Sequence, residues 1–208
     1  MTQRAVTVAD ATSDLIRRCR AGDENARAEL FGRYRHYLAM LAKAQLGRHL
    51  RTKCDASDIV QQTLLEAHRD FADFQGEHDG ELRAWLRRIL AHNLFNETRR
   101  YAAGQRDAAR EVSIDQLRAG VEESSLALGR GLAADTPSPS QDAAKREAAL
   151  QLADALARLP EDYQTVILLR VFEQLPSNEV AERMGRTAGA IRMLQMRALE
   201  ALRDEMAK

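Results

Sequence analysis

Four side chains between Glu81 and Arg100 have the types and the spacing of a chemically active surface. Arg88, His92, Asn96 and Arg99 follow one another at intervals of three or four residues, so on a helix they share one face. Arginine together with amide and imidazole groups suits contacts with backbone phosphates and with unstacked bases. The composition of this face is therefore suited to contact with nucleic acid.

An aromatic residue and further charges accompany this face. Trp85 lies in the same predicted helix, while Arg83, Arg87 and Arg100 add positive charge around it. An indole ring can serve as a base-stacking platform or as an anchor in the hydrophobic core. The sequence leaves both interpretations of Trp85 open.

A second candidate surface lies near the C-terminus, where the pattern predicts three helices. Pro160 opens the first of them, and Ser177 can cap the second, which ends before Gly185. A glycine at that point favours a tight turn between two helices. Thr187 can then cap the third helix, from Ala188 to about Arg203. The last two helices have the arrangement of a helix-turn-helix.

The last helix is predicted to be basic on one side and apolar on the other. Arg186, Arg192, Arg197 and Arg203 lie on it or beside it, and Glu200 is its only acid before Arg203. A helix with a buried apolar side and an arginine-bearing side is what docking in the DNA major groove requires. The alternative is an ordinary helical hairpin with a solvated basic face.

A third candidate surface is polar and lies on the helix predicted from Asp55 to Phe71. Its exposed side carries neutral glutamines and a leucine between an acid and a base, namely Asp58, Gln61, Gln62, Leu65 and Arg69. Such a face fits protein docking, although a merely solvated surface has the same composition. The pattern alone does not separate the two.

Composition excludes several classes of protein. The chain has 208 residues and a formal net charge of +0, so any affinity for DNA must come from local positive charge. Cys19 and Cys54 form no CxxC pair, and the five histidines form no HExxH motif, so we expect neither a disulfide framework nor a metal site. No nucleophile–base cluster is visible. We therefore expect no catalytic residues, no metal and no cofactor, and we do not expect an enzyme.

Helical periodicity divides the chain into three parts. Residues 1–103 read as a helical domain and residues 143–208 as a second one. Between them, residues 104–142 are rich in acids, glycine, proline and serine, which predicts a long, mostly extended acidic linker with room for a short helix near Ile114–Leu117. The predicted fold class is all-α, with two helical domains. No signal peptide or membrane span is visible, so we expect a cytoplasmic protein.

Two long segments resemble bacterial sigma factors. DASDIVQQTLLEAHRDFADF, followed by LRAWLRRILAHNLFNETRR, resembles their second conserved domain. LPEDYQTVILLRVFEQLPSNEVAERMGRTAGAIRMLQMRAL resembles the fourth, which carries a helix-turn-helix. The two-domain layout is similar to that of the extracytoplasmic-function (ECF) group of the sigma-70 family. The resemblance covers most of the chain outside the linker and the extreme N-terminus.

The resemblance implies a specificity subunit that binds core RNA polymerase and promoter DNA. The N-terminal domain would bind a coiled coil of the largest polymerase subunit, and the polymerase flap region is the other expected contact. The residues implied in the coiled-coil contact are Asp58, Gln61, Gln62 and Leu65. Recognition and melting of the start-proximal (−10) element would involve Arg87, Arg88, His92, Asn93, Asn96, Arg99 and Arg100. The loop Phe74–Gly80 resembles one that receives a flipped base.

The same resemblance assigns the C-terminal domain to the distal (−35) promoter element. The residues nearest DNA would be Arg186, Thr187, Gly189, Arg192 and Arg197. The acidic linker would pass near the polymerase active site and RNA exit path. An anti-sigma factor is an open partner, and we expect a monomer when the chain is free, without membrane insertion.

Two features weaken a direct transfer of promoter sequence and leave alternatives open. Met193-Leu-Gln-Met196 makes the last helix less basic than is usual in the family, and the linker is long. The leading alternative is a two-domain helix-turn-helix regulator that senses a ligand or a phosphorylation. Such a regulator should dimerise on palindromic DNA without polymerase. A hydrolase or metal enzyme is the other class considered, and it lacks the residues.

Overall fold

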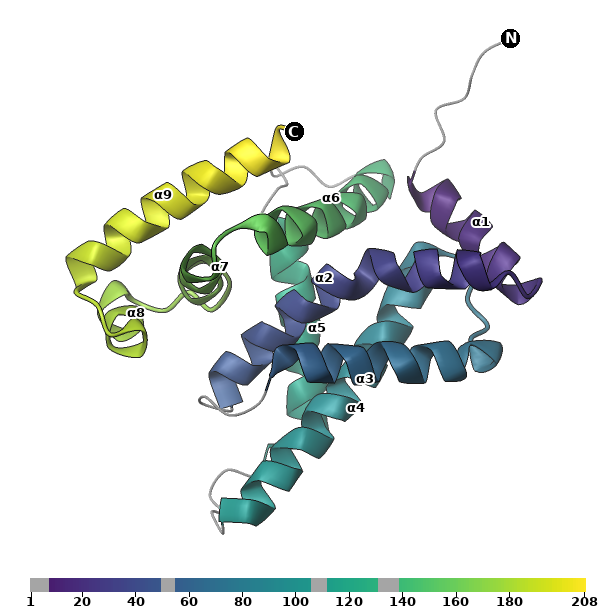
Figure 1. Ribbon diagram of the computed structural model, residues 1–208, viewed down its shortest axis with the longest axis horizontal. Coiled ribbons are helices and arrows are strands. Elements are labelled where there is room, and N and C mark those ends of the chain that lie inside the picture. Colours follow the sequence, from purple (N-terminus) through teal and green to yellow (C-terminus); the bar gives the residue numbers. More distant parts are fainter. Residues whose placement is uncertain (1–7, 50–54, 106–111, 131–138) are drawn as a thin grey trace.

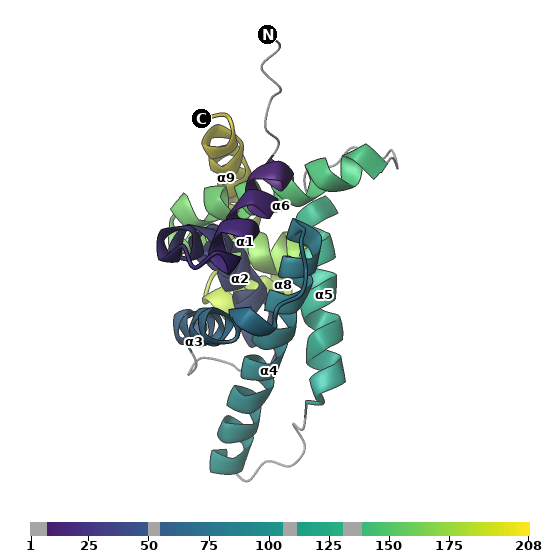
Figure 2. The same cartoon turned by 90° about the vertical axis from the view of Figure 1, so that its right-hand side faces the viewer.

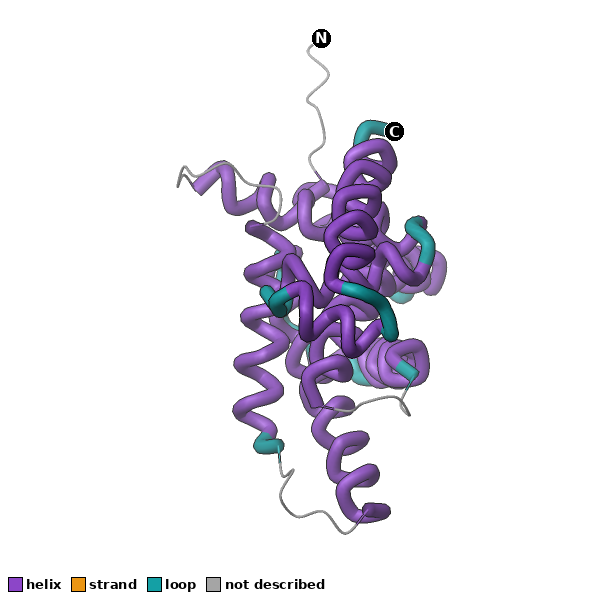
Figure 3. Tube along the Cα trace, turned by 90° about the vertical axis from the view of Figure 1, so that its left-hand side faces the viewer, coloured by secondary structure: helices purple, strands orange, loops and turns teal. Residues whose placement is uncertain are grey.

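The computed structural model describes residues 8–49, 55–105, 112–130 and 139–208, and in these ranges the chain forms helices, turns and loops without a β-strand (Figures 1 and 3). The all-α prediction is therefore confirmed. The elements are α1 (Val8–Arg20), α2 (Glu24–His49), α3 (Ala56–Arg69), η1 (Phe71–Asp73), α4 (Asp79–Gln105), α5 (Ile114–Arg130), α6 (Pro139–Arg158), α7 (Glu161–Ile167), the π-helical turn η3 (Leu168–Phe172), α8 (Ser177–Met184) and α9 (Ala188–Met206).

Helix α2 is the centre of the structure. It packs against α1, α3, α4, α5 and α6, and a helix with neighbours on all sides must be apolar around most of its circumference. Leu30, Tyr34, Tyr37, Leu38 and Leu41 are accordingly all fully buried. The chain thus folds around one long helix, α2, and its N-terminal and C-terminal parts lie on different sides of that helix (Figure 1).

An aromatic cluster fixes the start of α4 against α3. The Trp85 ring centroid lies 5.1 Å from that of Phe74, which in turn lies 5.8 Å from that of Phe71. Phe71 and Phe74 are buried. This packing supports the core-anchor interpretation of Trp85 among the two that the sequence left open.

The prediction that residues 104–142 form a mostly extended linker is wrong for most of the described part of this segment. Residues 114–130 form the helix α5, and α6 begins at Pro139 rather than at residue 143. Leu117, Val121 and Leu128 recur at helical spacing and are buried, because α5 packs on α2 and α4 (Figure 2). The acids of this helix, Asp115, Glu122 and Glu123, are exposed. Residues 106–111 and 131–138 of the expected linker lie outside the described residues.

A glycine allows α5 to approach α2 closely. A Cβ atom at Gly120 would lie 2.4 Å from Gln45 Oε1, which no real contact permits. The Gln45 side chain donates from Nε2 to Ser124 Oγ at 2.9 Å, and the Tyr37 hydroxyl pairs with Ser125 Oγ at 2.8 Å. Polar contacts therefore accompany the buried leucines in holding α5.

The C-terminal helices also contact α2. Asp154 Oδ1 of α6 lies 2.8 Å from His36 Nδ1, and Lys43 Nζ donates to Gln164 Oε1 at 2.8 Å. In this structure the two halves of the chain therefore form one assembly. The domain boundaries at residues 103 and 143 stay a prediction.

Among the described residues, no helix is long and apolar enough to cross a membrane.

Candidate nucleic-acid interface

Helix α4 presents the predicted basic face to solvent. Arg88, His92, Asn96 and Arg99 are all exposed, while Leu86 and Leu90 on the other side are buried. The guanidinium carbon of Arg99 lies 5.6 Å from the Phe95 ring centroid, so this arginine lies over an aromatic face of its own helix. The C-terminal end of α4 projects beyond the bundle (Figures 1 and 2). A long partner could therefore lie along this face without a steric clash.

Arg87 does not belong to this exposed face. Its Nε lies 2.8 Å from Glu122 Oε2 on α5, and its Nη1 donates to the Tyr37 hydroxyl at 3.1 Å. Burial opposes the charge, but Tyr37 and Glu122 together raise the pKa of the guanidinium above its ordinary value. Arg87 is therefore a charged link between α2, α4 and α5.

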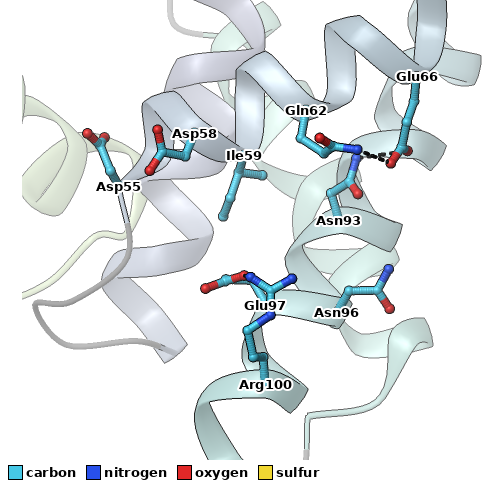
Figure 4. A pocket seen from close by; sticks show the side chains of 9 residues that line it. All are labelled: Asp55, Asp58, Ile59, Gln62, Glu66, Asn93, Asn96, Glu97 and Arg100. Carbon is cyan, nitrogen blue, oxygen red and sulfur yellow. Dashed lines mark hydrogen bonds and ion pairs between the residues drawn. The ribbon is translucent and has the colours of Figure 1, made fainter. Parts of the chain in front are cut away.

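Asn93, which the resemblance also implied in DNA contact, points into the joint between α3 and α4. It is 8% exposed, and its Nδ2 donates to Thr63 Oγ1 at 3.3 Å and to Glu66 Oε2 at 3.1 Å. Figure 4 shows Asn93 directed toward Glu66, which also accepts from Gln62 Nε2 at 2.8 Å. The amide thus positions the two helices.

An open polar cleft of about 490 Å³ separates the exposed faces of α3 and α4 (Figure 4). Its charged lining is mainly acidic, and Arg100 is engaged there by Glu97, with Nη1 2.7 Å from Oε2. An acidic cleft repels phosphate. The basic face of α4 therefore consists chiefly of Arg88, His92, Asn96 and Arg99, of which Asn96 also lines the cleft. The cleft lining is Asp55, Asp58, Ile59, Gln62, Glu66, Asn93, Asn96, Glu97 and Arg100.

The α3 face predicted for protein docking is solvent-exposed. Asp58, Gln61 and Gln62 are exposed, and the Leu65 side chain is 59% exposed. The side chain of Asp55 caps the helix by accepting from the Ser57 amide at 2.8 Å. A large exposed leucine among neutral amides is a feature that a protein partner can cover.

The loop Phe74–Gly80 is held closely against α1 and α4. Arg20 Nη2 donates to the carbonyls of Phe74 and Gly76 at 3.1 and 2.8 Å. The Glu81 carboxylate accepts from the amides of Glu77 and His78 at 2.7 and 3.1 Å, which lowers its pKa. The one aromatic side chain of this loop, Phe74, is buried.

Helices α8 and α9 form the predicted helix-turn-helix. Gly185 has φ of 63°, the left-handed conformation that ends α8. The Thr187 hydroxyl caps α9 by accepting from the Ala190 amide at 3.2 Å. Ser177 is the first residue of α8 rather than its cap, which is Pro176. The turn therefore has the geometry that the Gly185 and Thr187 patterns predicted.

The DNA-facing candidates on this motif differ in their surroundings. Arg192 and Arg197 are exposed, and neither has an ion-pair partner in the described part of the chain. Arg186 is paired with Asp162 of α7. Thr187 and Gly189 are exposed at the start of α9. Met193 and Met196 are also exposed on this helix. From the sequence we infer only that they make the helix less basic, and their exposure is not predicted.

The two basic faces lie in different regions of the molecule. In Figure 1, α9 runs along the outer edge opposite α3 and α4, with α2 and α6 between them. Among the described residues, no three His, Cys, Asp or Glu side chains are grouped to hold a metal ion. The geometry thus provides two separated basic helix faces, on α4 and α9, and one exposed polar face on α3.

Comparisons with known proteins agree with this arrangement. Residues 149–202 match the family model described as Sigma-70, region 4. The chain is 29% identical over 192 residues to the ECF RNA polymerase sigma-E factor of Haemophilus influenzae, covering 92% of this chain and 93% of that protein. It is 27% identical over 188 residues to the RNA polymerase sigma-H factor of Pseudomonas aeruginosa, covering 90% of each.

Among solved structures, the chain aligns with a flagellar sigma/anti-sigma complex, Sigma-28/FlgM, at a TM-score of 0.37 and 19% identity, over 90% of this chain and 97% of that one.

Proposed function

We propose that the chain is a member of the sigma-70 family, in its ECF group, and that it binds core RNA polymerase and directs promoter-specific transcription initiation. In this role α9 binds the distal promoter element in the major groove. The exposed face of α4 binds the start-proximal element and helps to melt it. The protein acts as a specificity subunit and not as an enzyme.

The observation that carries the proposal is the presence of two separated basic helix faces on one chain. Each face offers a handful of arginines, so each alone would bind duplex DNA weakly and with strong salt dependence. Holding both faces on one polymerase makes the second contact intramolecular, which raises the effective concentration. This arrangement fits a subunit that reads two promoter elements within a larger complex.

The α3 face supplies the polymerase contact in this proposal. Asp58, Gln61, Gln62 and Leu65 are assigned to the coiled coil of the largest subunit, and the C-terminal domain to the flap region. Leu65 would provide the apolar centre and the amides its polar surroundings. An anti-sigma factor that covered either domain would compete with these contacts. The free chain is proposed to be a monomer.

Run-off transcription with purified core polymerase tests the proposal. Genomic fragments are transcribed with and without this protein, and we expect discrete start sites only in its presence. The triple variant Arg88→Ala/His92→Ala/Asn96→Ala should lose these products while it still binds core polymerase. Arg35→Ala is a matched control, because it removes one exposed positive charge of α2 outside all three faces.

The competing function is a conventional helix-turn-helix regulator. Such a protein would bind palindromic DNA tightly as a dimer without polymerase. No new start sites, together with tight palindrome binding by the protein alone, would overturn the sigma-factor proposal.

A further inference from the structure

Two methionines are exposed on α9, the helix that the proposed function places on the distal promoter element. Met193 is 49% and Met196 is 55% exposed, and both are among the few large hydrophobic side chains that remain exposed in the described residues. A solvent-exposed pair of this kind on an otherwise charged helix indicates a surface that is covered when a partner binds.

Helical spacing places the methionines at the centre of the exposed face. Ile191, Ala198 and Leu202 are buried against the rest of the domain. At 3.6 residues per turn, the opposite side of α9 is formed by Gly189, Met193 and Met196. This strip is therefore the part of the helix that would lie deepest in a groove.

Arginines border the strip on both sides. Arg192 lies along one edge and Arg197 along the other, and both are exposed. Edges carrying positive charge complement the phosphates of the two strands that bound a major groove, while the centre faces the base edges. Charge complementarity thus identifies duplex DNA as the occupant of this face.

The centre of the strip offers no hydrogen-bond donor that could read guanine or adenine. Gln195 could read adenine in principle, but its Oε1 accepts from Arg170 Nε at 3.0 Å, which turns it toward the π-helical turn η3. Glu200 and Asp204 follow on the exposed side and repel phosphate, so they limit the groove contact to the first turns of α9. Only apolar contacts remain for the central positions.

We propose that Met193 and Met196 read thymine C5-methyl groups in the distal promoter element, while Arg192 and Arg197 hold the flanking phosphates. This inference rests on the proposed function and specifies its sequence recognition. The thymine methyl is the apolar feature that the major groove presents to side chains. Gly189 permits close approach at the start of the strip, since a Cβ atom there would have only Thr187 Oγ1 nearby, at 4.0 Å.

Selection from a randomised promoter library tests this proposal. The full-length protein is assembled with core polymerase, and templates that carry a randomised distal segment are selected by transcription. The distal segment is synthesised with thymidine in one pool and with deoxyuridine, which lacks the methyl group, in the other. We expect thymine preference at one or two positions, and a loss of about three- to fourfold in selection per contacted methyl in the deoxyuridine pool.

Three variants identify the side chains responsible. Met193→Ala and Met196→Ala should each abolish the deoxyuridine penalty at one position and leave the other positions unchanged. Arg197→Ala should weaken selection uniformly and keep the penalty, because a phosphate contact carries no base information. Since both methionines are exposed, their truncation should not unfold the domain.

The outcomes separate this inference from the proposed function. If transcription is selective but the thymidine and deoxyuridine templates are transcribed equally well, recognition of the methyl groups is overturned and the sigma-factor proposal stands. A loss of selection on deoxyuridine templates that persists in both Met193→Ala and Met196→Ala would also overturn recognition of the methyl groups by these side chains. Methionine variants that lose binding of a protein partner, with no change in DNA preference, would assign the strip to that partner instead. Absence of any selective transcription would overturn both proposals.

Discussion

Arg87 and Glu122 lie 35 positions apart in the sequence, yet Arg87 Nε is 2.8 Å from Glu122 Oε2. The pair joins α4, which carries a basic face, to α5, which lies in the segment predicted as a linker. Arg87 also donates to the buried Tyr37 of α2. The neighbouring Arg88 is exposed, so two adjacent arginines of one helix have different surroundings, and the consequence can be measured.

Arg87→Ala should destabilise the protein, whereas Arg88→Ala should not. Loss of the Tyr37 and Glu122 contacts should lower the free energy of unfolding by about 1–2 kcal/mol, while truncation of the exposed Arg88 should change it by less than about 0.5 kcal/mol. Arg88→Ala should instead reduce promoter opening. Urea unfolding and permanganate footprinting of the holoenzyme measure the two effects. Equal stability of both variants would show that Arg87 is not held as described.

The two asparagines of α4 form a second matched pair. Asn93→Ala removes a buried amide and its hydrogen bonds to Thr63 Oγ1 and Glu66 Oε2, which should cost about 1–3 kcal/mol of stability. Asn96→Ala should leave stability unchanged within about 0.5 kcal/mol and reduce open-complex formation. Thermal unfolding and heparin-resistant complex assays distinguish them. A fully stable Asn93→Ala protein with impaired melting would return Asn93 to the DNA-contact set.

Packing of α5 predicts unequal costs for two leucine truncations. Leu117 is fully buried, so Leu117→Ala should lower the free energy of unfolding by about 2–5 kcal/mol. Leu126 is 57% exposed on the same helix, and Leu126→Ala should have little effect. Limited proteolysis should cut α5 faster only in the first variant. Identical behaviour of the two would mean that α5 does not pack in solution.

Two glycines of the helix-turn-helix should respond in opposite directions to alanine. Gly185 has φ of 63°, so Gly185→Ala should destabilise by about 1–2 kcal/mol. Gly189 lies inside α9 with open space around it, so Gly189→Ala should stabilise by up to about 1 kcal/mol. The added methyl group would nonetheless lie on the groove-facing strip and should weaken distal-element binding. Calorimetry measures the two changes in stability, and holoenzyme binding assays measure the change in binding of the distal element.

The Glu81 carboxylate should make the loop before α4 acid-sensitive. Its pKa is lowered from an ordinary value of 4.5 by the Glu77 and His78 amides, so its contribution is present above that value and is lost as pH falls through the lower, folded-state pKa. The advantage in Tm of wild type over Glu81→Ala should be constant near neutral pH and shrink below about pH 4.5. A pH-independent difference would contradict the carboxylate cap.

Local patterns predicted most of the helices because their signals lie within one element. Gly185 and Thr187 define the turn between α8 and α9 from sequence alone, and both have the expected geometry. The exposed positions Arg88 and His92 likewise follow from periodicity. Their role in promoter contact stays a prediction.

The remainder depended on tertiary contacts that no local pattern contains. Helical periodicity already places Asn93 on the buried side of α4 with Leu86 and Leu90. Its partners Thr63 and Glu66 lie on α3, and no local pattern contains them. Acids dominate the composition around Leu117, so the sequence predicts a linker with room only for a short helix near Ile114–Leu117, whereas the helix continues to Arg130. Burial against α2 decides that conformation, and the partner helix is more than sixty residues away in sequence.

The helical state of α5 also sets a length. Its 17 residues span about 26 Å as a helix, and the same residues would span about 58 Å if extended. If α4 and α9 bind the two promoter elements as proposed, a folded α5 keeps the connection between these two candidate DNA-binding faces short. Unfolding of α5 would lengthen that connection by about 30 Å. Burial of Leu117, Val121 and Leu128 is therefore expected to limit the promoter spacing that the protein can bridge.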